Sequence, residues 1–135
     1  MNRIDVVIGV VVRDRKVLIC QRCAQDRLGG YWEFPGGKQE PGESHQQCLA
    51  RELAEELQIQ VRAIEPLRII EHDYPDVRVR LHPYLCEHAE GEPTPLACQQ
   101  VLWVAPADLP TYRFPPANDQ LIRDLLSLPG HAADE

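Results

Sequence analysis

The chain has 135 residues, a length that corresponds to one domain, 1–135. Hydrophobic residues make up 44% and charged residues 26%, which is ordinary globular composition and argues against wholesale disorder. The formal net charge of −7 disfavours binding of a nucleic-acid polymer through its phosphates. An acidic chain can still bind a smaller anion when divalent cations lie between the two.

The hydropathy of the chain does not predict a targeting signal, and its cysteine spacing does not predict a disulfide framework. The longest apolar run, residues 6–12, is too short for a membrane span, and charged residues follow it instead of a cleavage site. The five cysteines are odd in number and irregularly spaced, and Cys20-x-x-Cys23 lacks a second pair at zinc-site spacing. We therefore expect a cytoplasmic protein with no membrane contact and no obligate protein partner.

The N-terminal part of the chain predicts short strands. Residues 4–12 and 17–19 are β-branched runs on either side of a charged turn, which predicts a β-hairpin. A turn at 28–30 leads to a strand at 32–34, and the Pro-Gly-Gly sequence at 35–37 is expected to end that strand.

Residues 44–58 predict the clearest helix of the chain. Ser44 is a suitable N-cap, and acidic residues lie just before it. An apolar stripe recurs at helical spacing through Leu49, Ala50, Leu53, Ala54 and Leu57.

The C-terminal part alternates strands with turns and ends in a helix. Strands are predicted at 64–70, 77–86 and 101–104, and an amphipathic helix at 118–128 is followed by a flexible tail at 129–135. Turns are expected at residues 91–95 and 106–110. The predicted class is α/β (α+β), a mixed sheet with helices packed on it.

Three glutamates of the predicted helix lie on one face. Glu52, Glu55 and Glu56 stand at positions i, i+3 and i+4, where their charges repel one another. A solvated helix face is the ordinary explanation. The glycine turn at 36–37 adds a second possibility, because clustered carboxylates and a backbone carbonyl form the kind of site that Mg²⁺ shares with substrate phosphates.

The spacing of these residues resembles a known motif, the Nudix box. The matching positions are Gly37, Glu43, Arg51, Glu52, Leu53, Glu55, Glu56 and Ile59. One position departs, because Nudix proteins usually have glycine where this chain has Gln58. A left-handed turn at that residue would cost glutamine about 1 kcal/mol, or the turn would be reshaped.

The resemblance implies a Nudix-type α/β/α sandwich and hydrolysis of a nucleoside diphosphate linked to another group, with Mg²⁺ or Mn²⁺. It implies that Arg51 orients a glutamate through a bidentate ion pair and that Glu43 braces the loop or binds metal. It assigns catalysis to Arg51, Glu52, Glu55 and Glu56, and the general base differs among members. The metal ligands it implies are Gly36, Gly37, Glu52, Glu55 and Glu56.

Three further segments resemble the MutT branch of the family, the 8-oxo-dGTP diphosphatases: residues 21–22, 32–38 and 114–118. The last implies that Asn118 binds the modified purine. Oxidation gives guanine a hydrogen on N7, so this edge offers a donor beside the O6 acceptor, which matches an asparagine amide. The alternative role of Asn118 is the N-cap of the last helix.

The implied substrate is 8-oxo-dGTP, hydrolysed to 8-oxo-dGMP and pyrophosphate, which would sanitise the nucleotide pool and prevent mutation. Arg22 is a candidate for contacts with the phosphates or with the 8-oxo oxygen, and Arg27 for phosphate contacts. Aromatic residues at 31–34 form either pocket walls or core. The full set of expected substrate-binding residues is Arg22, Arg27, Glu33, Phe34, Pro35, Gly36 and Asn118.

Two alternatives remain open. Nudix relatives that hydrolyse CTP or modified pyrimidine triphosphates share most of these segments but have aspartate at the position of Asn118. The second alternative is a non-catalytic module that recognises 8-oxoguanine. Such modules lack the acidic box, so the intact Glu52, Glu55 and Glu56 argue against it.

Overall fold

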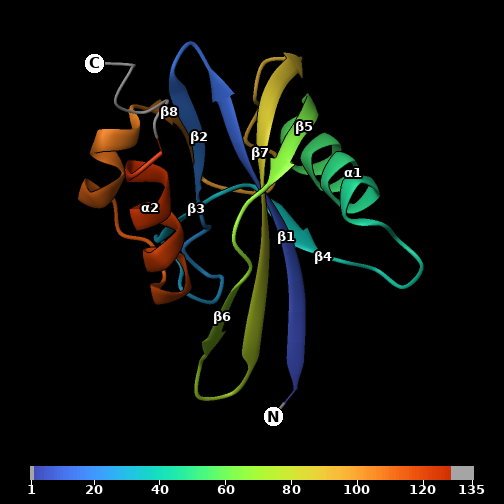
Figure 1. The fold of residues 1–135 in the computed structure, drawn as a ribbon, viewed down its shortest axis with the longest axis vertical. Coiled ribbons are helices and arrows are strands. Elements are labelled where there is room, and N and C mark those ends of the chain that lie inside the picture. The colour runs from blue at the N-terminus through green and yellow to red at the C-terminus, as the bar shows by residue number, and fades with distance from the viewer. Residues whose placement is uncertain (1, 129–135) are drawn as a thin grey trace.

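The computed structural model describes residues 2–128, which form a twisted mixed sheet with a helix on each side (Figure 1). The strands are β1 (Arg3–Arg13), β2 (Lys16–Gln21), β3 (Trp32–Glu33), β4 (Gly36–Lys38), β5 (Gln60–Pro66), β6 (Ile70–Asp73), β7 (Arg78–Glu90) and β8 (Gln100–Val104). The helices are α1 (His45–Leu57), α2 (Asp119–Leu126) and two 3₁₀ segments, η1 (Pro106–Thr111) and η2 (Pro116–Asn118).

The two long strands β1 and β7 form the centre of the sheet. They pair in parallel, in a register that runs from Arg3 opposite Arg78 to Val12 opposite Glu87. Every other pairing is antiparallel: β2 and β4 on β1, β5 and β6 on β7, and β3 and β8 on β2. The predicted mixed sheet is therefore confirmed.

Side-chain alternation along the central strands divides the core into two layers. Val7 and Val11 of β1 pack on the α1 side with Leu49 and Leu53, whereas Ile8 and Val10 pack on the α2 side. This period of two is what a strand buried on both faces requires. The acidic box is consequently carried by the helix that covers one face of the β1 and β7 pair.

Helix α1 has the predicted start and end. The Ser44 hydroxyl accepts the Gln47 amide at 3.0 Å, and the Gln47 side chain accepts the Ser44 amide at 2.8 Å, so both donors are satisfied in a capping box. At the other end Gln58 adopts a left-handed conformation with φ of 58°. The usual turn is therefore kept without glycine.

The strand expected at 64–70 is wrong. The chain forms β5 earlier, breaks after Pro66, and resumes as β6. Both pieces pair with the same long strand β7, and between them the Leu67 amide donates to the Pro83 carbonyl at 2.8 Å. The β-branched run gave no sign of this break, because each piece pairs separately with β7, which lies later in the sequence.

The strand expected at 32–34 does end before Pro35, as β3, but nothing in the sequence indicated that Gly36 and Gly37 belong to a further strand, β4. Gly36 has φ of 150°, and a Cβ atom on it would lie 2.1 Å from the Val7 carbonyl oxygen. Only glycine allows β4 to approach β1 this closely. The two glycines therefore allow β4 to pair closely with β1 beneath helix α1.

The C-terminal strands and helix differ from expectation mainly at their ends. Strand β7 extends to Glu90 because β5 pairs with its polar end, as far as Gln60 opposite Glu90. The last helix begins one residue later than predicted, after η2, and ends at Leu126. The tail expected at 129–135 lies outside the described residues. Within the described part of the chain, no helix is long and apolar enough to cross a membrane.

Candidate active site

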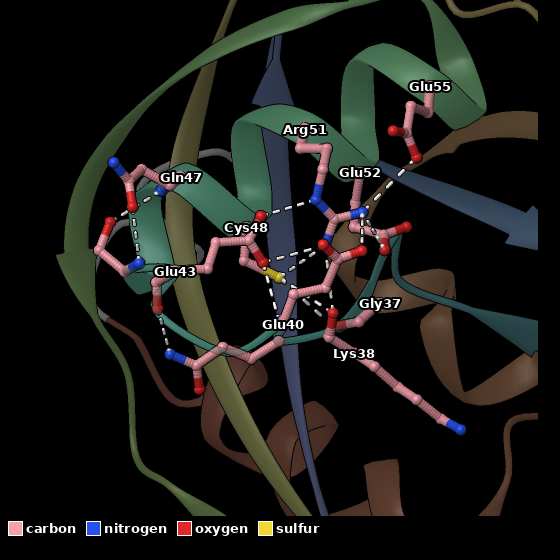
Figure 2. Close-up of polar contacts among 11 residues, drawn as sticks. Gly37, Lys38, Glu40, Glu43, Gln47, Cys48, Arg51, Glu52 and Glu55 are labelled. Atoms are coloured by element: carbon pink, nitrogen blue, oxygen red, sulfur yellow. Dashed lines mark hydrogen bonds and ion pairs between the residues drawn. The ribbon is translucent and has the colours of Figure 1, made fainter.

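Arg51 joins the loop before α1 to the acidic face of the helix (Figure 2). Its Nε donates to Glu43 Oε2 at 2.6 Å and its Nη2 to Glu43 Oε1 at 3.0 Å, which is a bidentate ion pair. Its Nη1 lies 3.0 Å from Glu52 Oε1. The Arg51 guanidinium holds the pKa of Glu43 at about 2. Glu43 thus holds the loop before α1 against Arg51, and its Oε1 also accepts a hydrogen bond from the Glu40 amide at 3.0 Å.

Glu52 lies directly over the glycine strand. A Cβ atom built on Gly37 would come within 2.4 Å of the Glu52 carboxyl carbon, so the absence of a side chain there makes room for this carboxylate. Cys48, one turn earlier on the same helix, also contacts this strand, with its thiol 3.5 Å from the Lys38 carbonyl oxygen and 3.7 Å from that of Gly37.

Glu56 approaches the neighbouring glycine and is partly desolvated. The Gly36 backbone favours its charged form, yet burial and then the charges of Glu52 and Glu33 raise the pKa of Glu56 to about 8. Glu55 differs: its side chain is 63% exposed and lies 3.5 Å from Arg51 Nη1.

A metal site is therefore only partly assembled. Within residues 2–128, no three acidic, histidine or cysteine side chains converge closely enough to hold an ion. Two carboxylates, those of Glu52 and Glu56, nevertheless reach the Gly36 and Gly37 backbone, and they repel each other. This oxygen donor set suits a hard divalent cation, which would relieve that repulsion.

A cleft of about 230 Å³ lies between β1, β7 and the segment before α2. Its floor is apolar, and Ile8, Phe34 and Leu81 contribute to it. Five of the residues expected to bind substrate line the cleft together: Arg22, Arg27, Glu33, Phe34 and Asn118. The structure does not place Pro35 or Gly36 on its wall. The Pro35 carbonyl instead accepts the Gly9 amide at 2.8 Å.

Arg22 and Glu33 form an ion pair at the cleft, with 2.8 Å between Nη1 and Oε1. Burial raises the pKa of Glu33, and Arg22 opposes that shift. Arg22 Nε also donates to the Arg27 carbonyl at 2.6 Å. The Arg27 guanidinium lies over the Tyr74 ring and 3.0 Å from Asp76 Oδ1, so this cation is already engaged by protein groups.

Asn118 is 8% exposed and does not cap helix α2 with its side chain. Its Nδ2 donates to the Pro115 carbonyl at 3.3 Å. Among residues 2–128, Asn118 Oδ1 accepts no hydrogen bond and Nδ2 donates only to Pro115, and the residue lines the cleft.

Sequence reasoning missed Tyr74 and Lys38, which also line the cleft. The Tyr74-Pro75-Asp76 turn between two predicted strands was the available signal. Sequence reasoning also missed the influence of Cys98, which together with burial raises the pKa of the Cys20 thiol. All five cysteines are unbridged.

Comparison with known proteins agrees with this geometry. The NUDIX domain model matches residues 6–124. This chain belongs to the Nudix family. Nudix hydrolases act on nucleotide diphosphates and generally need a divalent metal, so the chain is an enzyme of that class. The α+β fold expected from the Nudix box is confirmed by a solved MutT structure from work on Aliivibrio salmonicida and Vibrio cholerae. It is 32% identical, covers 93% of this chain and 97% of its own, and superimposes with a TM-score of 0.74.

Two Nudix relatives from Escherichia coli (strain K12) carry different substrate names. The CTP pyrophosphohydrolase is 34% identical over 128 residues, which is 95% of each chain. The 8-oxo-dGTP diphosphatase is 33% identical over 129 residues, which is 95% of this chain and all of the relative. Overall similarity therefore identifies a Nudix pyrophosphohydrolase and leaves the choice of base to the residues of the cleft.

Proposed function

We propose that this Nudix hydrolase converts 8-oxo-dGTP to 8-oxo-dGMP and pyrophosphate. The observation that carries the proposal is the position of Asn118, which lines a cleft with an apolar floor and whose amide makes one hydrogen bond among the described residues. Oδ1 would accept the N7 hydrogen of the oxidised base, and the second Nδ2 hydrogen would donate to O6. Unmodified guanine has an acceptor at N7, which would face Oδ1 without a hydrogen between them.

The phosphates would lie toward the acidic cluster, with Arg22 beside them. We propose Glu52, Glu55, Glu56 and the Gly36 and Gly37 backbone as the groups that hold the divalent cations. The cation would neutralise charge on adjacent phosphoryl groups and help to orient the attacking water. Arg51 and Glu43 keep the Glu52 carboxylate in place over Gly37, which is the contribution that this chain makes before any substrate binds.

A CTP pyrophosphohydrolase is the second candidate, because a relative of that name matches the same 95% of the chain. The two candidates differ in what the Asn118 amide must contact. In the first it distinguishes two purines that differ at one edge. In the second it would contact a pyrimidine, and oxidation of guanine would have no influence on binding.

The Asn118→Ala variant tests the proposal through two dissociation constants. The nucleotides 8-oxo-dGMP and dGMP share sugar and phosphate, so contacts from Arg22 and the cations cancel in the comparison. Loss of a bidentate base contact should weaken 8-oxo-dGMP binding about tenfold and leave dGMP binding nearly unchanged. Calorimetry measures both constants, with a melting curve as the control for folding. Equal weakening of both nucleotides would contradict base recognition by Asn118.

A further inference from the structure

Tyr74 lies in the turn between β6 and β7 and contacts two other segments of the cleft wall. The turn itself is held by two backbone hydrogen bonds, from the Tyr74 amide to the Val77 carbonyl at 2.8 Å and from the Val77 amide to the Tyr74 carbonyl at 3.3 Å. The ring therefore projects from a fixed backbone, and its two ends meet different partners.

The Tyr74 hydroxyl contacts the residue next to Asn118. It accepts the Ala117 amide at 3.3 Å, across 43 residues of sequence. Pro115 and Pro116 have no amide hydrogen, so Ala117 provides the first backbone donor of this segment, and Ala117 itself is 5% exposed. The hydroxyl thus satisfies a buried donor and attaches η2, which contains Asn118, to the β6–β7 turn.

The Tyr74 ring contacts the loop on the other side of the cleft. The Arg27 guanidinium lies 4.9 Å from the ring centroid and is held there by Asp76. The Arg27 carbonyl in turn accepts a hydrogen bond from Arg22. One side chain therefore connects the segment that carries Asn118 with the loop that anchors Arg22.

We propose that Tyr74 is a positioning residue that sets the orientation of Asn118 and thereby the preference for an oxidised purine. This inference rests on the proposed function. The hydroxyl acts through the backbone of Ala117, so its effect appears where the Asn118 amide meets the base. The acidic cluster on α1 lies outside this contact, and the hydrolytic step does not depend on it.

The Tyr74→Phe variant removes the hydroxyl and keeps the ring beneath Arg27. Loss of one neutral hydrogen bond should raise KM for 8-oxo-dGTP and weaken 8-oxo-dGMP binding about three- to tenfold. We expect kcat within about twofold of the wild type and dGMP affinity nearly unchanged. Tyr84→Phe is the matched control, because it also deletes a hydrogen-bonded hydroxyl, the partner of His45 at 2.7 Å, on the α1 side of the sheet.

A double-mutant cycle with Asn118→Ala separates positioning from general loosening. If Tyr74 acts through Asn118, the double variant should have the same ratio of dissociation constants for dGMP and 8-oxo-dGMP as the Asn118→Ala variant alone. Melting curves of all variants check that each is folded.

Two results would overturn the inference and leave the proposed function intact. In the first, the wild-type protein prefers 8-oxo-dGMP over dGMP and the Tyr74→Phe variant has the same preference. In the second, Tyr74→Phe and Asn118→Ala change this preference additively in the double variant. A wild-type protein that binds 8-oxo-dGMP no better than dGMP would instead overturn the proposed function, and the inference with it. The two failures are therefore distinguished by the wild-type ratio.

Discussion

Glu56 has surroundings unlike those of the other two box glutamates. It is drawn toward Gly36 and is close enough to Glu52 and Glu33 for their charges to raise its pKa, whereas Glu55 extends into solvent. A carboxylate in that position gains most from a cation, because the cation offsets both desolvation and repulsion.

We expect Glu56→Gln to keep the fold and lower kcat at least about 10²-fold, the scale of a lost electrostatic contribution to a transition state. The substitution keeps the size of the side chain and removes the charge that holds a hard cation. Initial rates at saturating Mg²⁺ measure the effect, and Glu65→Gln on exposed strand β5 is the control. Near-normal turnover would contradict the assignment of Glu56 as a metal ligand.

The residue types of the site were predictable, but their partners were not. The sequence indicated that Arg51 pairs with a glutamate, and the structure identifies Glu43 as the bidentate partner. Asn118 was recognisable from its motif, whereas Tyr74 was not, because its contact with Ala117 spans 43 residues. Arg27 was expected to contact phosphate, and only the folded chain shows Asp76 and Tyr74 beside it.

At the level of elements, helix α1 was predictable because its cap, its apolar stripe and its end all lie within one short stretch of sequence. The strands at 60–73 were not, because their bounds depend on how each piece pairs with β7, which lies later in the sequence. Strand β4 was missed for a similar reason: Gly-Gly is typical of a turn, and only the approach to Val7 shows that these glycines permit a strand pairing.

Gln58 provides a test of how the helix ends. Its φ of 58° places a side chain in the left-handed region, which glycine enters at lower cost. We expect Gln58→Gly to raise the free energy of unfolding by about 0.5–1 kcal/mol and to leave kcat unchanged. Urea denaturation measures the difference. A destabilised variant would show that contacts of the Gln58 side chain outweigh the backbone strain.

Asp5 and His82 connect the two central strands and predict a pH dependence of stability. His82 Nε2 lies 2.9 Å from Asp5 Oδ1, and this hydrogen bond lowers the pKa of Asp5. Because the folded-state pKa lies below that of the unfolded chain, the contribution is present above about pH 4 and is lost as the pH falls through the folded-state pKa.

The Asp5→Asn variant isolates this contribution. Its melting temperature should lie below that of the wild type at about pH 7, and the difference should shrink as the pH falls below about 4 and through the lowered folded-state pKa of Asp5. Thermal melts across this range measure the effect. A difference that stays constant with pH would mean that the hydrogen bond does not require an ionised Asp5.

At the scale of the whole molecule, the fold separates two tasks on one sheet. Helix α1 holds the acidic cluster on the glycine strand, and the segment before α2 holds Asn118 at the cleft. The formal net charge of −7 makes a triphosphate an unfavourable ligand unless cations accompany it. Base selection and phosphate chemistry are therefore expected to respond to different substitutions.

The most direct test is the comparison of kcat/KM for 8-oxo-dGTP, dGTP and CTP, with Mg²⁺ and with excess chelator, while pyrophosphate and orthophosphate are measured. We predict pyrophosphate release that requires the cation and a kcat/KM for 8-oxo-dGTP at least about 10²-fold above that for dGTP or CTP. Faster hydrolysis of CTP, or full activity in chelator, would contradict the account.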